Sequence, residues 1–96
     1  MNSQASHRLS VLSNEIRAAR ARLDRLRDCL DVQEAALDEC RVRMLIAETP
    51  LADRDLQLAA DDYLRIEREV RRVEEAITAL HEDESRLAQR LAAAGT

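Results

Sequence analysis

The sequence predicts an all-α protein: two long helices fold back on each other as an antiparallel coiled-coil hairpin, and the hairpin pairs into a helical bundle. Two hydrophobic ladders, whose members recur at alternating steps of three and four residues, indicate this fold class. A single proline, Pro50, separates them. The first ladder consists of Leu9, Leu12, Ile16, Ala19, Leu23, Leu26, Leu30, Gln33, Leu37, Cys40 and Met44. The second ladder consists of Leu56, Ala59, Tyr63, Ile66, Val70, Val73, Ile77, Leu80, Glu84, Leu87 and Leu91.

A chain of 96 residues has room for one domain. The polar residues 1–6 are expected to form a flexible N-terminus, and residues 7–94 are expected to form the hairpin. We expect a first helix at residues 7–47, a turn at 48–50 and a second helix at 51–93. Ala, Leu, Arg, Glu and Asp dominate the composition, which is typical of long helices.

The turn is predicted from the residues around the proline. Thr49 is a favourable N-cap and Pro50 suits the first helical position, because its missing N–H would have no helical partner there. One continuous helix is the alternative. However, the residue before a proline resists the α conformation, and the heptad phase breaks between Met44 and Leu56. Both observations favour the hairpin.

The charges beside the ladders favour pairing between the two helices. With the first residue of each ladder taken as position a, positions e and g carry mostly Arg in the first helix and mostly acidic residues in the second. In an antiparallel pair e faces e and g faces g, so the two flanks attract each other. In the register that a tight turn imposes, Arg41 is expected beside Asp53 and Arg43 beside Asp55. Such exposed pairs select a register more than they stabilise it.

The same register brings two polar ladder members together, since Gln33 then faces Tyr63. An amide and a phenol can hydrogen-bond each other, and a lone polar layer in an apolar seam fixes register at some cost in stability. We therefore predict Gln33 and Tyr63 as a register pair. A partly exposed Gln33 without such a role is the alternative.

Apolar residues outside the ladders gather near the turn. A lone hairpin buries one stripe on each helix, which rarely outweighs the entropy of the chain. A widened apolar stripe is typical of a helix that contacts more than one neighbour. We therefore predict a second interface, which either closes a homodimeric four-helix bundle or receives a different helical protein. The predicted interaction surface consists of Val42, Leu45, Ile46, Leu51, Leu58 and Leu64.

No catalytic, metal or cofactor site is predicted. The run from His81 to Glu84 lacks the spacing of a metal site and is interpreted as a solvated helix face. Cys29 and Cys40 lie about 16 Å apart along one helix, too far for a disulfide. They are interpreted as reduced small hydrophobes, with an interchain disulfide as the alternative.

The charge pattern also disfavours a nucleic-acid partner. The net charge is −4, and Arg residues alternate with acidic ones instead of forming a basic stripe. A Rop-like RNA-binding bundle is therefore a weaker alternative. A small helical enzyme of the chorismate mutase type is another, because arginines could bind a dicarboxylate. Such sites usually also use a lysine, and this chain has none.

Length and expected shape resemble the WXG-type secreted helical hairpins. The turn reads Glu48-Thr49-Pro50-Leu51, without Trp-x-Gly, and no tyrosine export motif follows near the C-terminus. The chain is also similar in length and shape to small hairpin chaperones and stalk-like components of bacterial protein-export machines. These resemblances imply a role in secretion as an alternative function, and they transfer no residue.

The function predicted from the sequence is that of a non-enzymatic coiled-coil interaction module with an assembly, adaptor or chaperone-like role. Its expected partner is itself, as a dimer or tetramer, or another helical protein, with no membrane, nucleic acid or cofactor involved. No apolar run is long enough for a signal peptide or a membrane span, and the expected location is the cytoplasm.

Overall fold

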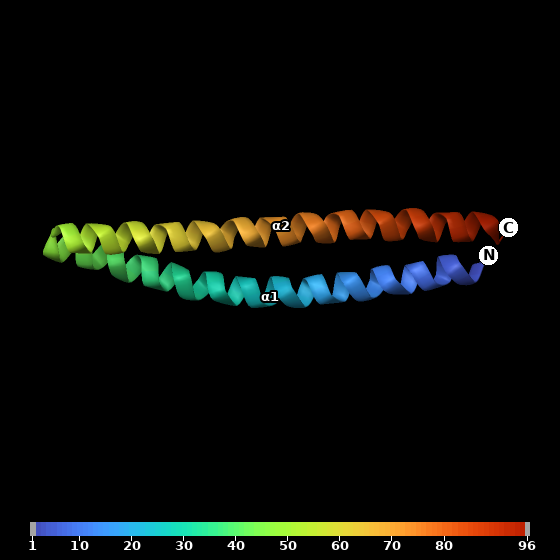
Figure 1. The fold of residues 1–96 in the computed structure, drawn as a ribbon, viewed down its shortest axis with the longest axis horizontal. Helices are drawn as coiled ribbons and strands as arrows, with labels where there is room; N and C mark the ends of the chain where they lie inside the picture. The colour runs from blue at the N-terminus through green and yellow to red at the C-terminus, as the bar shows by residue number, and fades with distance from the viewer. Residues whose placement is uncertain (1, 96) are drawn as a thin grey trace. The chain divides into compact units, whose positions relative to one another are not determined.

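A computed structural model describes residues 2–95 and contains two helices, α1 (Asn2–Ala47) and α2 (Pro50–Ala94). They run antiparallel, pack against each other and are joined at one end by Glu48 and Thr49 (Figure 1). The part of the chain that the structure describes contains no strand. The predicted all-α hairpin is thereby confirmed.

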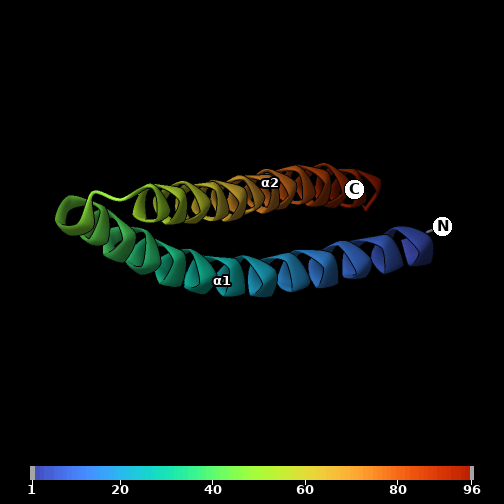
Figure 2. The ribbon, with the colours of Figure 1, turned by 60° about the vertical axis from the view of Figure 1, so that its left-hand side comes forward.

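Figure 2 shows the reversal between the helices. Two local hydrogen bonds stabilise it. Glu48 adopts a left-handed conformation with φ of 47°, and its N–H donates to the carbonyl of Met44 over 3.0 Å, which ends α1. The Thr49 hydroxyl oxygen then accepts from the N–H of Ala52 over 3.2 Å. The predicted N-cap is therefore confirmed, with Pro50 as the first residue of α2.

The helix boundaries differ from the prediction at several ends. Helix α1 begins at Asn2 rather than at residue 7, so residues 2–6 of the expected flexible N-terminus are helical, while Met1 lies outside the described residues. This stretch is polar, but it contains no glycine or proline, so nothing local prevents the helix from extending into it. Helix α2 includes Pro50 and ends at Ala94, one residue beyond the prediction at either end.

The chain divides into two units. The first, called here the terminal unit, joins residues 1–23 to residues 72–96, and the second, called the turn unit, comprises residues 24–71. Each unit has its own apolar seam. The buried residues of the terminal unit are Leu12, Ile16, Leu23 and Val73, and those of the turn unit are Leu37, Ala52 and Val70. All except Ala52 belong to the predicted ladders, so heptad spacing identified the core.

The predicted ion pairs between the helices near the turn do not form. Arg41 instead pairs with Asp38 over 3.0 Å, and Arg43 pairs with Glu39 over 3.6 Å. Both partners lie on α1 itself, three or four residues away, where side chains of one helix meet without crossing the seam. The charges beside the turn therefore contribute within α1 rather than between the helices.

Candidate interaction surface

Seven large apolar side chains of the turn unit point into solvent. Their exposed fractions range from 44% for Leu64 to 79% for Ile46. We call them the turn surface, and they are Val32, Val42, Leu45, Ile46, Leu51, Leu58 and Leu64. The structure thus exposes all six residues of the predicted interaction surface and adds Val32. Groups of exposed large apolar side chains are typical of sites of association.

These residues lie on the side of each helix that faces away from its partner. They occupy heptad positions b, c and f, whereas the seam uses a and d. Within the turn unit we call the b, c and f positions of residues 24–46 the α1 outer face. The corresponding positions of residues 50–71 form the α2 outer face. Each outer face points away from the seam, so one chain cannot bring its two outer faces together.

The α1 outer face combines apolar and acidic residues. Its large apolar members are Val32, Val42, Leu45 and Ile46. It carries five acidic residues and a single arginine, Arg25. The acidic residues are Asp24, Asp28, Asp31, Asp38 and Glu39. The face is therefore suited to a partner that presents apolar groups flanked by positive charge.

The α2 outer face has the opposite sign. Its large apolar members are Leu51, Leu58 and Leu64. It carries four arginines and a single acidic residue, Asp61. The arginines are Arg54, Arg65, Arg68 and Arg71. The same chain thus presents an acidic apolar face on one helix and a basic apolar face on the other.

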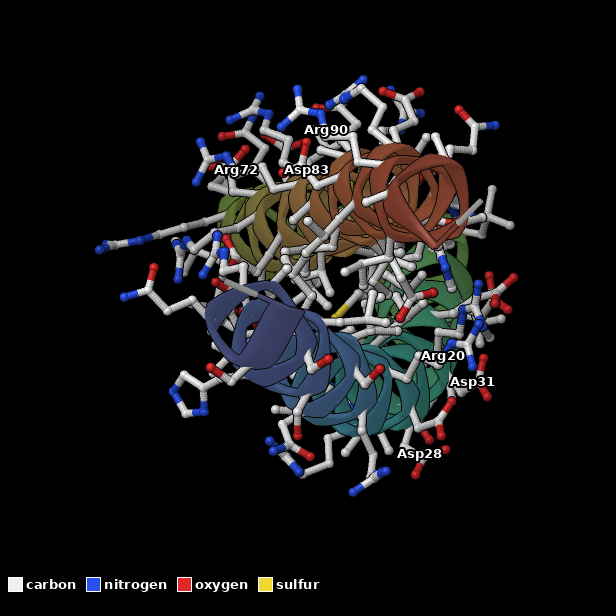
Figure 3. All side chains as sticks on the ribbon, turned by 90° about the vertical axis from the view of Figure 1, so that its right-hand side faces the viewer. Arg20, Asp28, Asp31, Arg72, Asp83 and Arg90 are labelled. Carbon is white, nitrogen blue, oxygen red and sulfur yellow. The ribbon has the colours of Figure 1, made fainter. Side chains whose placement is uncertain are left out.

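Several of these charges have no ion-pair partner among residues 2–95. On α1 they are Asp24, Asp28 and Asp31, and on α2 they are Arg54 and Arg68. Asp28 and Asp31 lie on the outer side of α1 and point away from α2 (Figure 3). Within the described residues these charges make no ion pair, so they are available to a partner.

The predicted register pair lies in the turn unit, where Gln33 and Tyr63 are both half-buried. The hydroxyl of Tyr63 hydrogen-bonds the Glu67 carboxylate of its own helix. Partial burial raises the pKa of Tyr63 above its ordinary value of 10.0; the carboxylates of Glu67 and Glu34 raise it further, and Arg41 lowers it. A bond between Gln33 and Tyr63 stays a prediction.

A polar cluster crosses the seam of the terminal unit. The Ser13 hydroxyl donates to Glu84 Oε2 over 3.0 Å, and an Arg20 guanidinium nitrogen lies 2.9 Å from His81 Nε2. His81 Nδ1 lies 3.7 Å from Glu84 Oε1. Arg20 can only donate, so Nε2 accepts and the ring proton lies on Nδ1, towards Glu84. The cluster lines a shallow pocket of about 250 Å³ together with Ile16 and Arg17.

This cluster corrects the interpretation of the run from His81 to Glu84 as a solvated face. Glu82 and Asp83 are exposed, as expected, whereas His81 and Glu84 are half-buried and bonded to α1. The reason is that Glu84 occupies a seam position one heptad after Ile77, where partly buried polar side chains form hydrogen bonds across the interface. Its partner Ser13 lies beside the first ladder, so ladder spacing alone does not reveal it.

The remaining candidate chemistry is sparse. Cys29 is exposed, Cys40 is half-buried, and both are free thiols. Within residues 2–95, no group of three or more His, Cys, Asp or Glu side chains is arranged to hold a metal ion. Neither helix, over its described residues, has an apolar stretch sufficient to cross a membrane.

The sequence matches no protein-family model, and comparisons with curated proteins and with solved structures find no match. The features above are therefore what supports a function for this chain.

Proposed function

We propose that this chain is a non-enzymatic interaction module that binds helical partners, either its own copies or another helical protein, through the turn surface. The observation that carries this proposal is the placement of the seven exposed apolar residues. All of them lie within residues 24–71, and the exposed large apolar residues include none from the described part of the terminal unit. Chance exposure would scatter them over both units. As part of the proposal, we expect this association to take place in the cytoplasm.

The energetic reason for association is the apolar area left in water. Burying apolar surface contributes about 25 cal/mol per Å², so covering several half-exposed Leu, Ile and Val side chains stabilises a complex by several kcal/mol before the costs of association. Helices suit these faces as partners, because positions b, c and f repeat along the helix at the spacing that a second helix can match.

A photocrosslinking experiment tests the proposal. A benzophenone side chain is placed at Val42 or Leu58, and matched controls carry it at Ala18 or Ala79, which are exposed c positions of the terminal unit. Irradiation of the cells that express the variants should yield crosslinked protein adducts from positions 42 and 58 and few adducts from positions 18 and 79.

A second variant separates docking from chance proximity. Changing Leu45, Ile46, Leu58 and Leu64 to Gln should abolish the adducts formed from position 42, while the helical circular dichroism persists, because these side chains contribute little to the seam. Equal adduct yields from both units, or no adducts at all, would refute the proposal.

A further inference from the structure

We infer that copies of this chain associate through unlike faces, with the α1 outer face of one copy against the α2 outer face of the next. This inference rests on the proposed function and names its partner. Each face combines exposed apolar residues with charges, and the charges of the two faces are opposite in sign.

Charge complementarity selects unlike over like pairing. Two α1 outer faces would bring five acidic residues against five, and two α2 outer faces would bring four arginines against four. Like charges placed together in an interface cost several kcal/mol, whereas the unlike arrangement pairs acid with arginine. Asp28 and Asp31 on one side and Arg68 on the other have no ion-pair partner among residues 2–95, so they are available for such pairs.

The placement of the faces determines the kind of assembly. Because the two outer faces point away from each other, a contact between unlike faces leaves one face free on each copy. Such heterologous contacts continue to add copies, either as an open series or until a ring closes. Association through these faces should therefore not stop at two copies.

The test uses one substitution on each face at sites of matched exposure, Val42 at 54% and Leu58 at 53%. Val42→Arg sets a positive charge against the arginines of the next copy, and Leu58→Glu sets a negative charge against its acidic residues. Ala18→Arg and Ala79→Glu place the same charges at c positions of the terminal unit as controls. Mass is measured by sedimentation over a wide range of concentrations.

The wild-type chain and both control variants should grow beyond two copies as concentration rises. Val42→Arg alone and Leu58→Glu alone should each associate at least tenfold more weakly. Their equimolar mixture should associate more strongly than either variant alone, because each variant retains the face that the other has lost. If either variant loses helical circular dichroism, Ile46→Arg or Leu51→Glu replaces it on the same face.

Three results would overturn the inference: a wild-type chain that remains single, one that stops at two copies, or a mixture that fails to associate. A single chain that still forms crosslinks from position 42 to another protein would refute self-association and leave the proposed function intact. A single chain without any crosslinks would refute both.

Discussion

Replacing Leu12 with alanine removes the most buried large side chain of the described chain, which is 2% exposed. Leu→Ala substitutions in protein cores cost about 2–5 kcal/mol. A two-helix seam can partly collapse around the gap, so we expect about 2–3 kcal/mol here. At about 4–8 °C per kcal/mol for a domain of this size, the midpoint of thermal unfolding should fall by about 10–20 °C.

The matched substitution is Leu45→Ala, because Leu45 is 77% exposed. Only about a quarter of its burial contribution is lost, roughly 0.5 kcal/mol. The higher helix propensity of alanine offsets part of this loss. In dilute solution the midpoint should therefore move by no more than about 3 °C. At high concentration the effect should grow, because Leu45 then lies in the predicted contact between copies and binding to the folded state stabilises it.

Thermal unfolding followed by circular dichroism, repeated at low and high protein concentration, measures both variants. Equal losses for the two substitutions in dilute solution would refute the distinction between the seam and the turn surface. A loss at position 45 that is independent of concentration would refute its role in association.

Three further predictions concern single polar contacts. Ser13→Ala should lower the free energy of unfolding by about 1 kcal/mol in the wild-type chain and by clearly less in a Glu84→Leu background, and a double-mutant cycle measures the difference. Equal losses in both backgrounds would contradict the hydrogen bond between Ser13 and Glu84. The phenolate absorbance of Tyr63, the only tyrosine, should appear above pH 10, because the pKa of Tyr63 is raised in the folded chain. The stability of the chain relative to Tyr63→Phe should be constant below about pH 10 and should fall as pH rises through the folded pKa. A Tyr63 that titrates at or below its ordinary pKa would contradict the structure. Glu48→Gly should raise the free energy of unfolding by up to about 1 kcal/mol, because glycine adopts a φ of 47° without strain. Chemical denaturation measures this free energy, and a loss of stability would show that the Glu48 side chain makes a stabilising contact.

The exposed apolar residues of the turn surface were predictable from the sequence, but the contacts of the charges around them were not. Apolar residues off the ladder, such as Leu45 and Leu58, are visible in the sequence as violations of the heptad pattern, and the structure exposes them. Which charges remain available to a partner depended on the actual contacts. Arg43 was expected across the seam but pairs with Glu39 on its own helix. Short-range partners on one helix compete with partners across a seam, and composition cannot decide between them.

The polar cluster in the terminal unit could not be predicted for a similar reason. Ser13 and Glu84 are 71 positions apart in sequence, and their hydrogen bond depends on the register and rotation of two helices. The position of the Ser13 hydroxyl beside the first ladder does not identify its partner until the register and rotation of the two helices are known. The same holds for the contact between Arg20 and His81.

The sequence by itself determined the two helices, their reversal at Thr49 and Pro50, and the residues of the seam. These follow from local rules, since hydrophobic spacing matches the helical period and a threonine can cap where a proline begins. Only the tertiary structure decided which side chains cross the seam, where the chain divides into two units, and which charges stay without partners on the outer faces. Those outcomes depend on distances of a few ångströms between residues far apart in sequence, which spacing along one helix does not specify.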